Sequence, residues 1–337
     1  KETTWFYAKV LSEHLPTAVD VISDMILHSK LDDAEIEREK NVVLEEIMRY
    51  EDTPEELVHD VFAQTLWQGH PLGNPVIGTR SAVESFSRES LVHHLQQAYT
   101  PDNMVVSAAG NLDHAALVEL IEKHFGSLSG RQNKRHVHPA KATGDSKLTS
   151  KPVEQVHFCI GTRGYTQYCK DRYVLAVMDA ILGGGMSSRL FQEVRENRGL
   201  VYTIGSYTAS YREGGMFTVY AGTSIKNAEL VIDLVKKEFE TIKKEPVDDA
   251  EITRAKNQIR GALVLGQESM SNRMSRMANS ELYFGRIVPV QEVIDAIMQV
   301  KAEDVMRVAN ELFVDGQIAF AAVGPFKRVR KGKKEAA

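Results

Sequence analysis

The hydrophobic pattern predicts a long helix between residues 33 and 51. Its apolar stripe consists of Ile36, Val43, Ile47 and Tyr50, at successive spacings of seven, four and three residues. Such spacings place side chains on one face of a helix. Asp32 or Asp33 stands where an aspartate accepts hydrogen bonds from the first helical turn. The pattern indicates a capped amphipathic helix with a polar outer face.

Runs of apolar and β-branched residues predict strands in both halves of the chain. Residues 103–110 (NMVVSAAG) and 317–324 (QIAFAAVG) have similar patterns, and residues 1–10 (KETTWFYAKV) also resemble a strand. Residues 205–222 predict two strands around a turn at 213–215, which contains two glycines. We expect an α+β fold made twice, each copy a mostly antiparallel sheet with helices packed on it.

The chain contains an internal duplication. Residues 32–41 (DDAEIEREKN) and 248–257 (DDAEITRAKN) agree at eight of ten positions. Further matches at nearly the same offset extend the repeat: Tyr7-Ala8 with Tyr220-Ala221, Asp20 with Asp233, and Gly110 with Gly324. Because the agreement extends beyond the short segment, it indicates two homologous copies.

The repeat and a polar segment together predict the domain boundaries. Residues 1–128 form the N-terminal domain, 129–150 a linker rich in Gly, Lys, Arg and Ser, 151–326 the homologous C-terminal domain, and 327–337 a basic tail. The second copy begins near Lys151, so the offset places the start of the first copy roughly 60 residues before Lys1. We therefore expect the first copy to lack its first part.

Composition excludes several functional classes. The 337 residues include 43% hydrophobic and 26% charged side chains with a net charge of −5, which indicates a globular protein without a nucleic-acid surface. Two cysteines cannot form a disulfide framework, which suits a reducing compartment, and no apolar stretch is long enough to span a membrane. We expect a cytoplasmic protein, although a targeting peptide could have preceded Lys1.

The two copies differ where one of them carries acids. Glu39, Glu45 and Glu46 of the first copy correspond to Ala255, Gly261 and Ala262 of the second. Glu39 and Glu46 lie on or beside the apolar stripe, two helical turns apart. Either they flank the stripe and remain solvated, as glutamates usually do, or they carry chemistry that one copy alone retains.

Several segments resemble one family. NVVLEEIMRYEDTPEE, preceded by DDAEIEREK and followed by GHPLGNPVIGT, is similar to the pitrilysin/insulinase-type zinc peptidases, in particular to bacterial members that resemble the mitochondrial processing peptidase. KETTWFYAKVLSEHLPTAVDVISDM and ILGGGMSSRLFQEVRENRGLVYTIGS extend the resemblance over essentially the whole chain.

The resemblance implies a Zn²⁺ site, with one ion per complete catalytic subunit. In the family an H-x-x-E-H motif supplies two histidine ligands and a general-base glutamate, and a distant glutamate completes the site. By the match, Glu46 resembles that third ligand and Glu39 the acid that orients a ligand. This sequence departs from the family because none of its eleven histidines lies in an H-x-x-E-H motif. His157 and Cys159 alternate on a strand and are interpreted as packing residues.

The second copy matches another feature of the family. Arg195 and Tyr202, in VRENRGLVY, resemble the arginine and tyrosine that contact the substrate backbone and the developing oxyanion. We expect Arg195 in a helix closed by Gly199, and Tyr202 in the following strand. Without the resemblance, Arg195 would be interpreted as a solvated helix residue and Tyr202 as half-buried. Residues 183–185, three glycines, predict a helix stop.

The sequence thus predicts a zinc-dependent endopeptidase that resembles the processing peptidase and hydrolyses extended or unfolded peptides with a metal-activated water. The chain as given should be inactive and bind no zinc tightly, because two histidine ligands and the base are missing. The alternative is a noncatalytic subunit of the family that binds peptides or stabilises a catalytic partner. The resemblance also implies a homodimer or a heterodimer with a related subunit.

Overall fold

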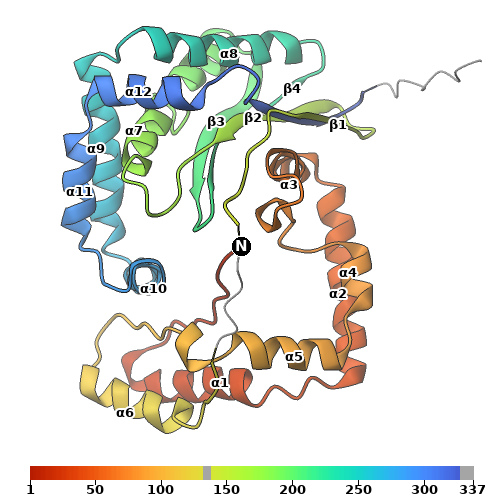
Figure 1. Ribbon diagram of the computed structural model, residues 1–337, viewed down its shortest axis with the longest axis vertical. Coiled ribbons are helices and arrows are strands. Elements are labelled where there is room, and N and C mark those ends of the chain that lie inside the picture. Colours follow the sequence, from red (N-terminus) through yellow and green to blue (C-terminus); the bar gives the residue numbers. More distant parts are fainter. Residues whose placement is uncertain (132–137, 327–337) are drawn as a thin grey trace, which may run out of the picture. The chain divides into compact units, whose positions relative to one another are not determined.

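The computed structural model describes residues 1–131 and 138–326 (Figure 1). Its contacts group the chain into two compact units. The first unit comprises Lys1–Ile47, Val76–Val137 and Arg260–Asp295, and the second comprises Met48–Pro75, His138–Ile259 and Ala296–Ala337. Each unit therefore draws on both halves of the sequence. The predicted basic tail and residues 132–137 of the predicted linker lie outside the described residues.

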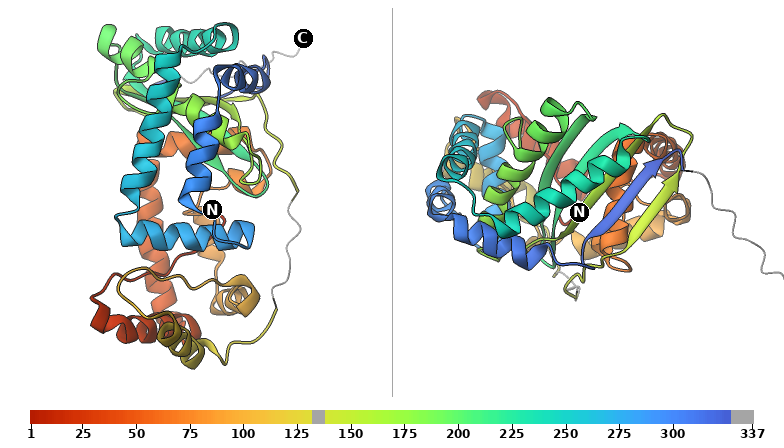
Figure 2. Two further views of the ribbon diagram at one scale, coloured as in Figure 1. Left: turned by 90° about the vertical axis from the view of Figure 1, so that its left-hand side faces the viewer. Right: turned by 90° about the horizontal axis from the view of Figure 1, so that it is seen from above.

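The strands of the described residues form one five-stranded sheet in the second unit. They are β1 (Ser146–Ser150), β2 (Gln155–Arg163), β3 (Val201–Ser210), β4 (Gly215–Ser224) and β5 (Ala319–Gly324), in the order β1-β5-β2-β4-β3. β1 and β5 run parallel, and lie side by side in the right-hand view of Figure 2, whereas the other neighbours pair antiparallel. The predicted hairpin around residues 213–215 is confirmed as β3 and β4.

Helices cover one face of this sheet (Figure 1). They are α7 (Arg172–Leu182), α8 (Ala228–Lys244) and α12 (Ala302–Leu312), and the second unit also contains parts of α9 (Asp249–Gly266) and α11 (Val290–Gln299). The buried core beneath them includes Phe217, whose ring meets the rings of Phe239 and Phe313 edge-on. The rings of Phe239 and Phe313 stack on each other, with 4.1 Å between their centroids. This continuous apolar face gives the second unit its main hydrophobic core.

The other face of the sheet is covered by α3 (Pro54–Leu66) (Figure 1). Its side chains Val58 and Phe62 are fully buried and belong to one cluster with Cys159, Ala321 and Val323 of the sheet. The helix thus comes from the first copy of the repeat but packs in the second compact unit. The sheet is therefore enclosed on both faces.

The first unit consists of helices and connecting segments in the described residues. Its helices are α1 (Leu15–Leu27), α2 (Asp33–Glu51, through Ile47), α4 (Arg80–Ser85), α5 (Arg88–Ala98), α6 (His114–Phe125), α10 (Met270–Phe284) and the parts of α9 and α11 that lie in this unit. Short 3₁₀ turns lie at Ser12–His14 and Pro101–Asn103, and a third, Pro71–Gly73, lies in the second unit. Helices α1 and α6 pack together, and Ser23 of α1 contacts His124 Nδ1 of α6 at 3.1 Å.

Two strand predictions in the first half were wrong. Residues 1–10 and 103–110 form no strand, although Met104 has extended backbone angles (φ −125°, ψ 141°). A strand exists only when a neighbouring segment accepts and donates its ladder hydrogen bonds. Within residues 1–131 and 138–326 these two segments have no such partner. The α+β class is confirmed, with its sheet in the second unit.

The end of the predicted linker also has regular structure. Ser146–Ser150 form β1, which pairs in parallel with β5. Its side chains are mostly exposed, including Leu148, so the segment carries no apolar alternation that would have marked it as a strand. Backbone pairing at the sheet edge, rather than burial of side chains, places this strand.

The repeated segments adopt the same local structure. Asp32 Oδ1 accepts from the backbone N–H of Ala34 at 3.0 Å, and Asp248 Oδ1 accepts from that of Glu251 at 2.8 Å. Helices α2 and α9 therefore begin with equivalent aspartate caps, as the duplication predicts.

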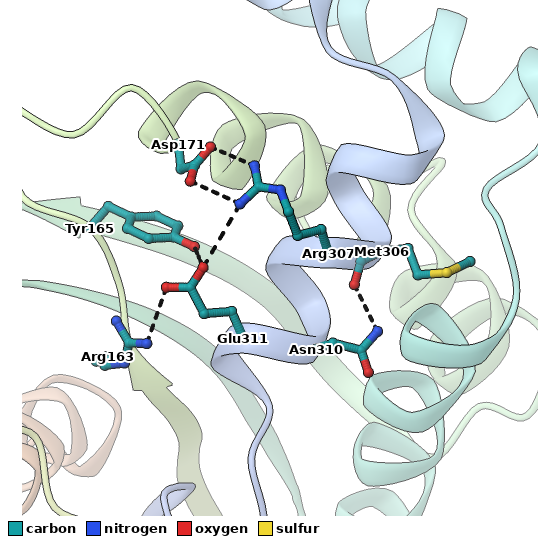
Figure 3. Close-up of polar contacts among 7 residues, drawn as sticks. All are labelled: Arg163, Tyr165, Asp171, Met306, Arg307, Asn310 and Glu311. Carbon is teal, nitrogen blue, oxygen red and sulfur yellow. Dashed lines mark hydrogen bonds and ion pairs between the residues drawn. The ribbon is translucent and has the colours of Figure 1, made fainter.

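A polar network ties the end of β2 to α12 (Figure 3). Arg307 donates to both carboxylate oxygens of Asp171, at 3.0 and 2.7 Å, and Glu311 accepts from Tyr165 Oη at 2.9 Å and from Arg163 Nη2 at 3.2 Å. These contacts fix the connection that leads from β2 into α7.

In the described residues, no helix is long and apolar enough to cross a membrane.

Candidate functional site

Arg195 lies in a wide helical turn that the sequence places just before β3. Residues Phe191–Asn197 form a π-helix, a type of turn that is rare and often occurs at functional sites. Val194 is fully buried and anchors it, while Gly199 ends it with a φ of +59°, which glycine adopts without strain. The predicted helix closed by Gly199 is confirmed.

The Arg195 guanidinium lies close to two aromatic rings. Its Cζ lies 4.8 Å from the centroid of the Phe191 ring and 5.6 Å from that of Tyr202. Both distances are within the range of cation–π attraction. The structure therefore brings together the two residues that the sequence singled out in the second copy.

Tyr202 is aimed outward by an irregularity in β3. The β3–β4 register shifts between Val201 and Thr203, which is a β-bulge at Tyr202. Bulges re-aim a side chain and are common beside active sites. The residue is 80% exposed, so its hydroxyl group is available to a ligand. It lies in β3, as predicted, but is far more exposed than its pattern alone suggested.

Within residues 1–131 and 138–326, the side-chain donors of Arg195 make no hydrogen bond. Its nearest carboxylate is Glu196, with 3.9 Å between Nε and Oε1, which is too long for a hydrogen bond. Glu193 instead pairs with Arg198 at 2.7 Å, and the hydrogen bond from Arg198 lowers the pKa of Glu193. In the described part of the chain, Arg195 side-chain nitrogens make no hydrogen bond, so they can bind a carbonyl or carboxylate oxygen.

The two candidate acids of the first copy lie exposed on α2. Glu39 and Glu46 both face solvent, which matches the solvated alternative. Ala255, the counterpart of Glu39, is 4% exposed and belongs to the core beneath α9. A glutamate there would bury an unpaired carboxylate. Packing therefore explains alanine at this position in the second copy, whereas Ala262, the counterpart of Glu46, is exposed.

The described residues do not by themselves fit a zinc ion. Among residues 1–131 and 138–326, no group of three His, Cys, Asp or Glu side chains could hold a metal. A catalytic zinc site needs three protein ligands. Glu46, the ligand that the family resemblance implies, would contribute one carboxylate, and no H-x-x-E-H motif occurs in the sequence.

A second cluster, which sequence reasoning missed, lies between α3 and the sheet. His59 Nδ1 is 2.7 Å from Tyr207 Oη and 3.5 Å from Cys159 Sγ, and its ring packs against Tyr220 at 4.9 Å between centroids. His157 Nδ1 contacts Tyr220 Oη at 2.9 Å. Burial lowers the pKa of both histidines and raises that of the Cys159 thiol. Only the pairing of α3 with the sheet, which no local pattern shows, brings these residues together.

Comparisons with known proteins identify the family on both parts of the chain. Residues 1–80 match the family model of insulinase (peptidase family M16), and residues 85–259 match that of the peptidase M16 inactive domain. The uncharacterized zinc protease YmxG of Bacillus subtilis is 38% identical over 96% of this chain and 79% of the relative. An uncharacterized zinc protease of Rickettsia felis is 34% identical over 96% of this chain and 78% of the relative.

Solved structures share the fold. A protease from Helicobacter pylori has a TM-score of 0.85 at 22% identity, covering 92% of this chain and 77% of that chain. The peptidase M16 inactive domain from Pseudomonas fluorescens has a TM-score of 0.81 at 20% identity, covering 92% and 74%. The fold agrees with the two family matches and the curated relatives, and the chain therefore belongs to the insulinase (M16) family of peptidases.

Proposed function

We propose that this chain belongs to a zinc-dependent endopeptidase that hydrolyses extended or unfolded peptides, with Arg195 and Tyr202 contacting the substrate. The observation that carries the proposal is the exposed pair itself. A guanidinium with unused donors lies beside an exposed phenol, and a β-bulge aims the phenol outward. The names of the zinc protease relatives support the peptidase and zinc parts of the proposal.

The chemistry of the pair suits a peptide backbone. The guanidinium presents planar N–H donors and the phenol presents an O–H donor. A carbonyl oxygen placed between them would accept from both, and these hydrogen bonds would strengthen as negative charge develops on that oxygen. Because the contacts are made to backbone atoms, they would impose little preference for particular side chains. The outer edge of β3 has no strand partner in the described sheet, which supports an extended substrate.

For the metal we propose that Glu46 provides one ligand and that Glu39 orients it. The remaining ligands and the general base would have to come from outside the described residues. The exposure of both acids is compatible with this role because nothing in the described structure covers them.

The proposal is tested by kinetics of Arg195→Ala and Tyr202→Phe in the zinc-bearing protein. Loss of one oxyanion donor typically lowers kcat about 100-fold or more. We expect a loss of this size in Arg195→Ala, and a smaller loss in Tyr202→Phe, with zinc content unchanged in both. Arg198→Ala is the matched control, because Arg198 lies three residues away but pairs with Glu193. Unchanged kcat in Arg195→Ala, or an equal loss in the control, would contradict the assignment.

A second candidate is a noncatalytic subunit of the same family that binds peptides or stabilises a catalytic partner. It is favoured by the match of residues 85–259 to the inactive-domain model and by the lack of a metal-holding group in the described residues. Any native sequence that precedes Lys1 would discriminate the two. An intact H-x-x-E-H supports the endopeptidase, and a degenerate motif together with peptide binding but no hydrolysis supports the subunit.

Assembly is a separate proposal. We propose that the protein pairs with a second copy or with a related subunit. Light scattering of the purified protein, alone and with a family partner from the same organism, tests this. A monomer under both conditions would contradict it.

A further inference from the structure

We infer that Phe191 is a positioning residue for Arg195, holding its guanidinium beside Tyr202 without using any of its hydrogen-bond donors. The inference rests on the proposed function, because it assigns Arg195 the role of binding a substrate carbonyl. It adds a residue to that site which no sequence motif marked. The observation behind it is the 4.8 Å distance from Arg195 Cζ to the centroid of the Phe191 ring.

The position of Phe191 follows from the π-helix. Phe191 and Arg195 are four residues apart, so their side chains lie on neighbouring turns of the same face. Phe191 is half-buried, and Val194 between them is fully buried. Partial burial therefore restrains the Phe191 side chain, whereas the Arg195 guanidinium makes no hydrogen bond in the described residues and has a carboxylate only at 3.9 Å, that of Glu196.

A second arginine of the same unit, Arg189, is held by hydrogen bonds to a carboxylate instead of by an aromatic ring. Arg189 donates from Nε to Glu251 Oε1 at 2.8 Å and from Nη2 to Glu251 Oε2 at 2.6 Å. A carboxylate partner of this kind occupies the edge of N–H donors that would otherwise bind a substrate. Arg189 is therefore a structural residue, with its donors engaged.

Neither acid next to Arg195 in the sequence accepts a hydrogen bond from its guanidinium. Glu193 is held by Arg198 and accepts from Asn197 Nδ2 at 3.4 Å, and Glu196 remains 3.9 Å away. An aromatic ring attracts the cation through its face but accepts no N–H in the plane of the guanidinium. The arrangement orders Arg195 and leaves its donors available.

The first test needs no enzymatic activity. Nuclear magnetic resonance of the 337-residue chain can follow the Nε–H group of Arg195 in wild type, Phe191→Leu and Phe191→Tyr. We expect the Arg195 side chain to become more mobile and its ring-current shift to shrink in Phe191→Leu. In Phe191→Tyr, the mobility and the ring-current shift should remain as in wild type. Tyr173→Leu is the matched control, since it removes a ring that lies 4.2 Å from Arg172 Cζ and leaves Phe191 intact. Unchanged Arg195 dynamics in Phe191→Leu, or equal loss in Phe191→Tyr, would overturn the inference.

The second test is a double-mutant cycle in the zinc-bearing protein. Phe191→Leu should lower kcat about two- to fivefold, the size expected for one exposed cation–π contact, and leave KM nearly unchanged. In an Arg195→Ala background the same substitution should have no further effect, because Phe191 acts through Arg195. Additive losses would show that Phe191 acts independently and would overturn the inference.

The two tests separate the inference from the proposed function. If the Arg195 dynamics respond as expected but wild type neither binds nor hydrolyses an unfolded peptide, the positioning role stands and the proposed function fails. If wild type is active but Phe191→Leu changes neither dynamics nor kcat, the proposed function stands and the positioning role fails.

Discussion

At the scale of single residues, Asp179 shows how burial changes a carboxyl group. Its Oδ1 accepts from Ser206 Oγ at 2.5 Å, and its backbone carbonyl accepts from the N–H groups of Gly183 and Gly184 at the end of α7. Burial raises the pKa of Asp179 to about 6, which the hydrogen bond from Ser206 only partly offsets. The ionised form at neutral pH is therefore a cost to the folded state.

We predict that Asp179→Asn stabilises the protein at pH 7.5. The folded pKa lies above the unfolded one, so the contribution of this group to stability is present at low pH and is lost as the pH rises through about 6. An asparagine keeps an acceptor for Ser206 and carries no charge, and the gain should be up to about 3 kcal/mol. Chemical denaturation at pH 7.5 and pH 4 measures it.

The gain should disappear at pH 4, where the native aspartic acid is largely protonated in the folded state. Asp233→Asn, on the exposed face of α8, is the control and should change little at either pH. A destabilised Asp179→Asn at pH 7.5 would contradict the prediction.

The sequence predicted the elements that hold Arg195 and Tyr202, but not the exposure of Tyr202 or the contact of Arg195 with Phe191. Arg195 and Tyr202 could be placed in a helix and a strand because Gly199 marks the boundary between them. The outward aim of Tyr202 depends on a shift in the β3–β4 register, which involves β4 as well as β3. Phe191 was missed although its spacing of four from Arg195 was visible, because such pairs usually serve packing.

At the scale of elements, α3 is the helix whose packing depends most on polar chemistry. His59 faces Tyr207, Tyr220 and Cys159 of the sheet, with His157 on the same sheet face and Asp60 next to it on α3. Burial lowers its pKa, with a further lowering by His157 and an opposing effect of Asp60. Nδ1 of the ring lies 2.7 Å from Tyr207 Oη, and protonation would place a cation in this largely buried contact.

We predict that the second unit loses stability as the pH falls below about 6.5, the ordinary pKa of a histidine side chain. The unfolded state then takes up a proton before folded His59 does, so the free energy of unfolding falls until the folded pKa is reached. The slope is at most about 1.4 kcal/mol per pH unit for each such histidine. His59→Gln should reduce this loss between pH 7.5 and 5.5.

Trp67 can report on this unit because it is 1% exposed, and Trp5→Phe removes the other tryptophan. His138→Gln in the same unit has an exposed side chain and is the control. If His59→Gln loses as much stability on acidification as the control does, His59 does not account for the acid sensitivity.

More of the predicted helices than of the predicted strands of the first half occur in the structure, for a physical reason. A helix such as α2 closes its own hydrogen bonds, and its cap at Asp32 is local, so the sequence pattern is sufficient. Residues 103–110 have strand character but need a partner segment. Conversely, β1 pairs with β5 without any apolar alternation that could have predicted it.

At the scale of the whole molecule, the pattern of strands and helices predicted the fold class and the motif resemblance predicted the family, and both are confirmed. The boundaries at 1–128, 129–150 and 151–326 stay a proposal about the two repeated copies. Compact units follow contacts instead, which is why Met48–Pro75 of the first copy groups with the second unit. A sequence repeat records ancestry, whereas packing of α3 on the sheet is a long-range contact that the repeat does not encode.

Zinc content of the protein produced from its complete native sequence tests the central claim most directly. We predict one zinc per chain in wild type and in Glu45→Gln, its exposed neighbour control, and loss of both zinc and peptide hydrolysis in Glu46→Gln. The reason is that a catalytic zinc held by three protein ligands does not tolerate loss of one. Wild type without zinc, or Glu46→Gln with full zinc and full hydrolysis, would contradict the account.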